Sequence, residues 1–275
     1  TAYTDWFPST ALEKMVELEA DRMQGLLFDP QVLESERGVV ASERRMSVEN
    51  NNEAILYENV RATAIMAHPY HWDVIGWMSD ILGWRPDDIK QYYQTYYAPN
   101  NAVLVVVGDF ESSKLMELIK KYYGPIPAQS PPPPIITVEP PQQGRKEVVV
   151  RKEAQTPSFM VVYHGPACTS PDFFALSILQ KPLVEGESSR LYRRLVRQEQ
   201  LALSVSGGIE EKIDPFLFMI EVKPRPGVDL TRIEKIIDEE LAKIIQEGLT
   251  ETEFEKARNI GLSSFYFGLQ TNSGK

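Results

Sequence analysis

Hydrophobic residues recur at helical spacing through much of the first half of the chain. Leu12, Met15 and Val16 begin one such stripe, and Asp29-Pro30 places proline at the first position of a further helix. The run AVLVVVGDF is continuously apolar and is typical of a strand buried on both faces. The elements predicted for this half are strands over 1–7 and 102–110 and helices over 11–28, from 30 towards 50–52, 53–66, 87–97 and 114–123.

The second half starts with strand-like patterns and ends with two long helical ones. Thr250 and Glu253 have the Ser/Thr-x-x-Glu spacing of a capping box, and Gly248 just before them suits a helix end. The elements predicted for this half are strands over 146–154, 158–166, 201–209 and 216–224 and helices over 172–184, 188–198, 229–246 and 250–269. This order predicts an α+β unit in which helices pack on one face of a mostly antiparallel sheet.

Proline density separates the two halves. The stretch YGPIPAQSPPPPIITVEPPQQG is typical of a stiff, extended linker and not of a packed element. The total length of 275 residues suits two domains. We therefore predict domains over 1–124 and 145–275, joined by a linker over 125–144.

The net charge of the chain limits the classes of molecule that it is expected to bind. The chain has 29 Lys and Arg against 39 Asp and Glu, a formal net charge of −10, which disfavours a nucleic-acid backbone as partner. No window has the apolar length of a membrane span, and the composition leaves the compartment open between periplasm and cytoplasm. The acidic balance mildly favours basic peptides as partners.

The most informative run is FDPQVLESERGVVASERRMSVENNN, which holds Glu36 and Glu43. These two residues are seven positions apart, so on a helix turning about 100° per residue they lie on nearly one line. Val39 and Val40 come between them, which predicts that the carboxylates lie on a core-facing or cleft-facing side. A carboxylate held there needs an arginine, a backbone donor or a metal ion, whereas a solvated, ion-paired helix is the alternative.

Five ordered blocks decide between these interpretations. They are ALEKMVELEADRM, FDPQVLESERGVVASERRM, HPY with IGW, YYAPNNAVLVVVGDF and SSRLYRRLVRQEQLALSVSGG. Together they span nearly the whole chain, and the chain resembles the pitrilysin/insulinase family of zinc metallopeptidases, in particular its bacterial and mitochondrial processing-peptidase branch. The resemblance implies two structurally related α+β domains around a chamber for peptides, of which the second lacks zinc.

The resemblance also implies site residues. In that family two histidines of a His-x-x-Glu-His helix bind zinc, and the glutamate between them activates a water. The third ligand is a glutamate in a pattern like E-R-x-x-V-x-x-E, which matches Glu36 to Glu43 here. By this match Glu43 is the metal ligand, and Glu36 is the family's second acidic residue, whose role would be to orient a metal ligand and tune its basicity.

The chain departs from the family in one decisive way, because no His-x-x-Glu-His is present. Glu43 is too near Thr1 to leave room for that helix, so we expect the domain over 1–124 to lack its N-terminal part and that over 145–275 to be incomplete at its C-terminus. With one zinc ligand and no general base, the chain alone is expected to be inactive and to lack Zn²⁺, which the intact protein would bind.

The remaining candidate residues are three histidines and one cysteine. His68 and His71 have possible ligand spacing in HPYHW, but Pro69 interrupts the segment, and packing or capping is the competing interpretation. His164 is expected to be structural. Cys168 lies in PACTSPD with no paired histidine motif, which favours a loop residue over a nucleophile.

Two functional hypotheses follow. The first is a fragment of a zinc-dependent metalloendopeptidase that hydrolyses peptides or unfolded segments by metal-activated water. The alternative is a non-catalytic peptide-binding subunit of a two-subunit peptidase of the same family. Both predict a peptide or unfolded-protein substrate, no nucleic acid and no membrane span, and either a homodimer or a paired non-catalytic subunit. Retention of both Glu36 and Glu43 favours the enzyme.

Overall fold

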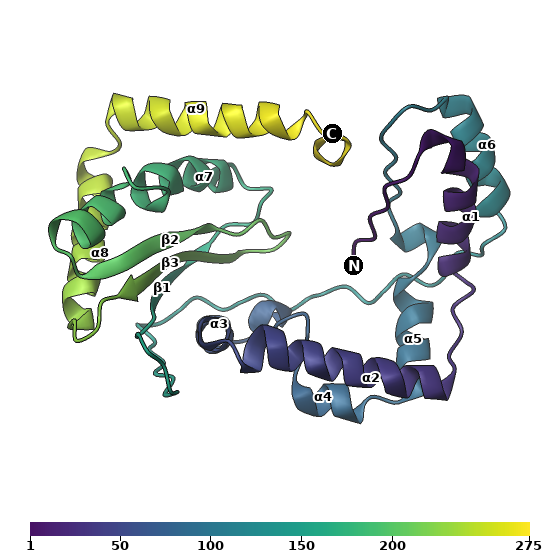
Figure 1. Cartoon of the computed structure of the whole chain (residues 1–275), viewed down its shortest axis with the longest axis horizontal. Helices are drawn as coiled ribbons and strands as arrows, with labels where there is room; N and C mark the ends of the chain where they lie inside the picture. Colours follow the sequence, from purple (N-terminus) through teal and green to yellow (C-terminus); the bar gives the residue numbers. More distant parts are fainter. The chain divides into compact units, whose positions relative to one another are not determined.

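A computed structural model describes all 275 residues (Figure 1). Contacts group the chain into two compact units, one of residues 1–44, 75–136 and 268–275 and the other of residues 45–74 and 137–267. The predicted domain boundaries stay a prediction, since these units are grouped by contact and not by independent folding. Residues 45–74, which come from the first half of the sequence, thus belong with the second half.

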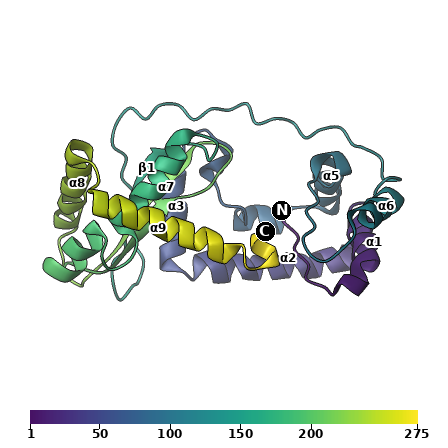
Figure 2. The same cartoon turned by 90° about the horizontal axis from the view of Figure 1, so that it is seen from above.

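The first unit is helical. α1 and α6 lie side by side in both views (Figures 1 and 2), with Val16 and Leu115 among their buried residues. An ion pair of 2.8 Å between Lys121 and Glu13 joins the same two helices. The helices of this unit are α1 (Leu12–Arg22), α2 (Pro30–Arg44), α4 (Met78–Gly83), α5 (Pro86–Tyr96) and α6 (Ser112–Tyr122).

Three predicted strands do not form. Residues 1–7, 102–110 and 146–154 have no partner in a β-ladder. Val103 and Val105 of the best apolar run are 90% and 74% exposed, where burial on both faces was predicted. Apolar, β-branched composition gives a segment strand propensity, but a strand exists only where another strand accepts its backbone hydrogen bonds. The chain offers none to these three segments.

The second unit is built on a three-stranded antiparallel sheet, which confirms the α+β fold class. The strands lie in the order β1-β3-β2, with β1 (Phe159–Gly165), β2 (Ala202–Ile209) and β3 (Phe216–Pro224). The helices are α3 (Asn52–Ala64), α7 (Pro171–Val184), α8 (Leu230–Glu247) and α9 (Glu251–Gly268), and π-helical turns run over Arg45–Glu49 and Tyr192–Gln198. All four predicted helical stretches of the second half are therefore present.

Both faces of this sheet are covered. Phe218, Ile220 and Val222 of β3 belong to one hydrophobic cluster with residues of α7 and α8 such as Leu183 and Ile233. Because strand side chains alternate, the neighbouring positions point to the other face.

On that other face, Leu217 packs with Ala64 and Ile65 at the end of α3, and Val162 and Met219 lie against the same cluster. The sequence predicted helices on one face; the second face is covered by a helix from the first half of the chain.

The start of α9 is held by the predicted capping box. The Thr250 hydroxyl accepts from the Glu253 N–H at 3.2 Å, and the Glu253 carboxylate accepts from the Thr250 N–H at 2.9 Å. Arg190 donates to both oxygens of that carboxylate, each at 2.7 Å. α8 ends at Gly248, whose φ of +74° is a conformation that favours glycine. One carboxylate therefore joins the beginning of α9 to the segment after α7.

Replacing Leu217 by alanine should lower the free energy of unfolding by about 2–5 kcal/mol, because the fully buried side chain leaves a cavity between β3 and α3. Denaturant unfolding measures the change. Ile213→Ala, at a position that is 79% exposed, is the control and should stay within about 0.5 kcal/mol of the parent. Equal losses in the two variants would contradict packing of α3 on the sheet.

Glu253 should make the unfolding free energy depend on acid pH. The Arg190 guanidinium, against the opposing effect of burial, lowers the pKa of Glu253 from 4.5 to about 2. A carboxyl whose folded pKa is depressed stabilises the fold above its unfolded pKa, and the contribution is lost as pH falls towards the folded value. Between pH 4.5 and 2 the Glu253→Gln variant should therefore lose less stability than the parent. The exposed Glu251→Gln serves as control, and parallel curves for parent and Glu253→Gln would refute the linkage.

Candidate functional site

α2 carries the two acidic residues that the sequence singles out. The helix starts where predicted, with Asp29 accepting from the N–H groups of Gln31 and Val32 at 2.7 and 3.4 Å and Pro30 in the first turn. This cap satisfies two of the N–H groups that a helix start leaves without partners. The helix then continues without a break to Arg44.

One side of α2 packs on the segment around α4. Ala41 and Arg44 are buried, and Arg37 is mostly covered. The guanidinium groups of Arg37 and Arg44 lie over the rings of Trp84 and Trp77, respectively. These two tryptophans therefore pack the loop around α4 onto α2. The sequence alone does not reveal this packing of the arginines, although their seven-residue spacing is visible beside that of the glutamates.

The other side of α2 is a stripe of Val32, Glu36, Val39 and Glu43, which we call the acidic-apolar stripe. All four residues are exposed, with 55% of Val32 and 56% of Val39 open to solvent. Their spacing of four, three and four positions places them along one line of the helix. The expectation that this side faces a core or cleft is not met within the chain, because no element of the chain covers the two valines.

The three histidines lie elsewhere, around the end of α3. His68 is buried; its Nδ1 accepts from the Tyr70 N–H at 3.1 Å, and its Nε2 lies 3.4 Å from Asp214 Oδ2. His71 Nδ1 bonds the Ile65 carbonyl at 2.5 Å.

The third histidine contacts the same turn. His164 Nε2 bonds the Ala64 carbonyl at 3.0 Å. Carbonyl groups at a helix end lack intrahelical partners, so these contacts stabilise the end of α3. They support the packing and capping interpretation of the histidines over metal binding.

A carboxylate closes the same turn from the proline-rich segment. Glu139 accepts from the N–H groups of Met66, Ala67 and His68 at 2.7, 2.8 and 3.0 Å. Burial opposes ionisation there, but the three N–H groups outweigh it and hold the pKa of Glu139 below its ordinary value. The proline-rich segment is therefore attached to the sheet unit at this point.

The donor set for a metal ion is incomplete in this chain. Glu43 offers carboxylate oxygens, which Zn²⁺ accepts as ligands. No group of three or more His, Cys, Asp and Glu side chains in the 275 residues is arranged to hold a metal ion. The residues present would supply one ligand of a zinc site and not a complete set of ligands.

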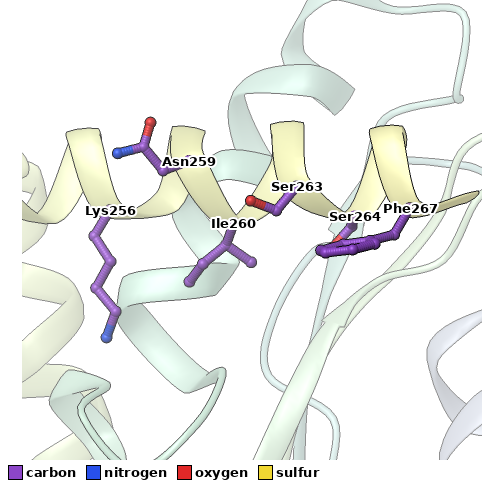
Figure 3. A pocket seen from close by; sticks show the side chains of 6 residues that line it. All are labelled: Lys256, Asn259, Ile260, Ser263, Ser264 and Phe267. Atoms are coloured by element: carbon purple, nitrogen blue, oxygen red, sulfur yellow. The ribbon is translucent and has the colours of Figure 1, made fainter.

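A cavity of about 640 Å³ runs along α9 (Figure 3). Lys256 and Ile260 point from the helix towards the elements beneath it, and Phe267 lies near its far end. Lys256 is the one titratable group of the lining, and its ammonium group donates to the Ser188 hydroxyl.

Cys168 lies in the loop before α7. The residue is partly exposed, and its backbone N–H donates to the Lys212 carbonyl. This contact holds the loop before α7 and agrees with the interpretation of Cys168 as a loop residue.

Comparison with known proteins identifies the family. A family profile described as the peptidase M16 inactive domain matches residues 83–260, more than half of the chain. The chain belongs to the M16 peptidase family. This result confirms the resemblance to the pitrilysin/insulinase metallopeptidases. The M16 match begins ahead of the predicted linker and so includes parts of both sequence halves.

Individual M16 relatives agree with this assignment. The chain is 34% identical over 265 residues to the zinc protease PqqE of Helicobacter pylori, covering 95% of this chain and 60% of the relative. It is 24% identical over 172 residues to the mitochondrial-processing peptidase subunit beta of Lentinula edodes, covering 60% and 36% of the two chains. The crystal structure of a protease from Helicobacter pylori superposes with a TM-score of 0.92 at 32% identity, covering 98% of this chain and 66% of that one.

The M16 chain described here therefore spans about 60% of the length of the Helicobacter pylori relative. Its homologues are named zinc proteases, and the profile that matches is of the inactive type. None of its helices combines the length and apolar content needed to cross a membrane.

The 275-residue chain alone should bind Zn²⁺ no more tightly than roughly micromolar, because one carboxylate is offered and each histidine bonds backbone or carboxylate groups. Isothermal titration of the chain and of His71→Ala should give the same weak binding. A tight 1:1 site that His71→Ala abolishes would overturn this reading of the histidines.

Proposed function

We propose that this chain supplies Glu43 as one ligand of the zinc ion of a metalloendopeptidase, with the other ligands and the general base provided by residues outside the 275. The acidic-apolar stripe carries the proposal. Exposed valines beside Glu36 and Glu43 suit a face that another protein element covers, and carboxylates enclosed by such an element need a cation. The zinc-protease names of the relatives support zinc as that cation.

The chemistry of such a site assigns a role to each residue of the stripe. A bound zinc ion lowers the pKa of a water and polarises a peptide carbonyl. Glu43 would hold the ion through its carboxylate. Glu36, two helical turns away on the same line, would keep the negative potential along the stripe and orient the ligand. The substrate would be a peptide or an unfolded segment, in keeping with the peptidase names of the relatives.

A second candidate is a non-catalytic peptide-binding subunit. The match to an inactive-domain profile and the absence of His-x-x-Glu-His from the sequence favour it. Such a subunit has no use for two carboxylates among exposed valines, so the stripe favours the zinc ligand.

In the intact, zinc-loaded protein, which would include the ligands proposed to lie outside these 275 residues, Glu43→Gln should weaken zinc binding by about 100-fold or more, and Glu36→Gln by roughly 10-fold, the lower end for groups that orient a ligand. Competition with a chelator measures both. Glu117→Gln makes the same change of charge at an exposed position of α6 and should have no effect. Unaltered zinc affinity in Glu43→Gln would exclude the ligand role and leave the binding subunit as the interpretation.

A further inference from the structure

The cavity along α9 is lined by one face of that helix. Its lining residues follow one another at helical spacing, so they share one side of α9. They are Lys256, Asn259, Ile260, Ser263, Ser264 and Phe267 (Figure 3). From the first of them to the last the helix rises about 16 Å. The cavity is therefore an elongated groove, which we call the α9 groove.

Lys256 places a cation at one end of the α9 groove. Its ammonium group has three N–H bonds, and the bond to the Ser188 hydroxyl uses one of them. The acidic side chains nearest to it along the helix, Glu253 and Glu255, are each paired with an arginine. The charge of Lys256 is therefore not matched by a carboxylate of the chain, and two N–H bonds are left for an anion.

Three neutral polar side chains follow along the groove. Asn259, Ser263 and Ser264 form no hydrogen bond with another group of the chain. Elsewhere in the chain the mid-helix serines Ser42 and Ser177 each donate to the carbonyl four residues earlier, at 2.8 Å. The two hydroxyls of the groove are thus available to a ligand, and the amide offers it both donors and an acceptor.

Ile260 and Phe267 give the groove its apolar surface. Ile260 points towards the elements beneath α9 and is half-buried. Phe267 is 67% exposed at the end of the groove opposite Lys256. An apolar group of a ligand that covered this ring would remove its surface from water, which is favourable.

This order of side chains fits a short peptide that ends in a free carboxylate. A carboxylate suits the ammonium group, and about 16 Å of groove holds about five residues of extended chain. A fatty acid would also satisfy the ammonium group and the apolar surface. It would leave the amide and the two hydroxyls covered without partners, which is costly, whereas a peptide backbone offers an N–H and a carbonyl at each residue.

We propose that the α9 groove binds the carboxyl-terminal residues of a peptide, with the terminal carboxylate at Lys256 and the peptide backbone along Asn259 and Ser263. An apolar side chain of the peptide lies against Phe267. The net charge of −10 disfavours anions over the chain as a whole, so the local charge of Lys256 selects the carboxylate. This inference goes beyond the zinc-ligand role of Glu43 and does not depend on it, since the groups involved belong to α9.

The test measures fluorescence anisotropy with the 275-residue chain and a pentapeptide of alanine and leucine that carries a dye at its N-terminus. The parent should bind the free-acid form about 10-fold more tightly than the same peptide ending in an amide, because a charge-assisted hydrogen bond is lost in the amide. Lys256→Gln should weaken binding of the acid to the level of the amide. Lys235→Gln removes the same charge from an exposed position of α8 and should keep the preference.

Two further variants separate the contributions of the groove. Lys256→Arg keeps the charge and should keep most of the preference for the acid. Asn259→Leu should weaken both peptides by about 3- to 10-fold, since it removes a partner of the peptide backbone. The comparison of acid and amide in the parent needs no variant, so the test remains decisive if Lys256→Gln does not fold.

Equal affinity of the parent for the acid and the amide would overturn the proposal, and so would an unchanged preference in folded Lys256→Gln. Decanoate is the competing ligand. Tighter binding of decanoate than of the free-acid peptide would assign the groove to fatty acids and contradict the proposal. Zinc binding by Glu43→Gln tests the proposed function separately, because neither peptide measurement requires a metal ion.

Discussion

The packing of α3 against the sheet of the second unit is the contact on which that part of the structure depends. A sheet of three strands has two faces, and α7 and α8 cover only one of them. The other face, with Leu217 and Met219, is apolar and needs a second layer. α3 supplies it, and a group of polar contacts at its end holds the layer in place.

Those contacts give the histidines of this region a structural role. His71 and His164 bond carbonyls at the end of α3, and Glu139 bonds the three N–H groups that follow. Backbone groups left without partners in a packed layer are costly, so each contact removes a penalty that would weaken the layer. The histidines therefore stabilise the fold, and the candidate chemistry of the chain is left to α2.

The sequence predicted what depends on neighbouring residues. Asp29-Pro30 and the Thr250–Glu253 box start helices because their caps bond within three positions, and both were found from spacing alone. The strand over 102–110 was predicted wrongly because pairing depends on a distant partner that composition does not reveal. The anchoring of Arg37 and Arg44 was missed for the same reason, since their carbonyl partners lie 45 and 32 positions away. The role of Glu43 came from the family resemblance and remains a prediction.

α2 shows how one helix can serve packing and chemistry at once. Its arginine side is held by hydrogen bonds and stacked rings, and its exposed side carries Glu36 and Glu43. If an apolar element covered Val32 and Val39, Glu36 and Glu43 would be enclosed with them, and enclosed carboxylates without a cation are strongly unfavourable. A purely structural interface would be better served by neutral residues at these two positions. The presence of two carboxylates on a side of fixed direction is therefore more consistent with ligation of a cation than with simple docking.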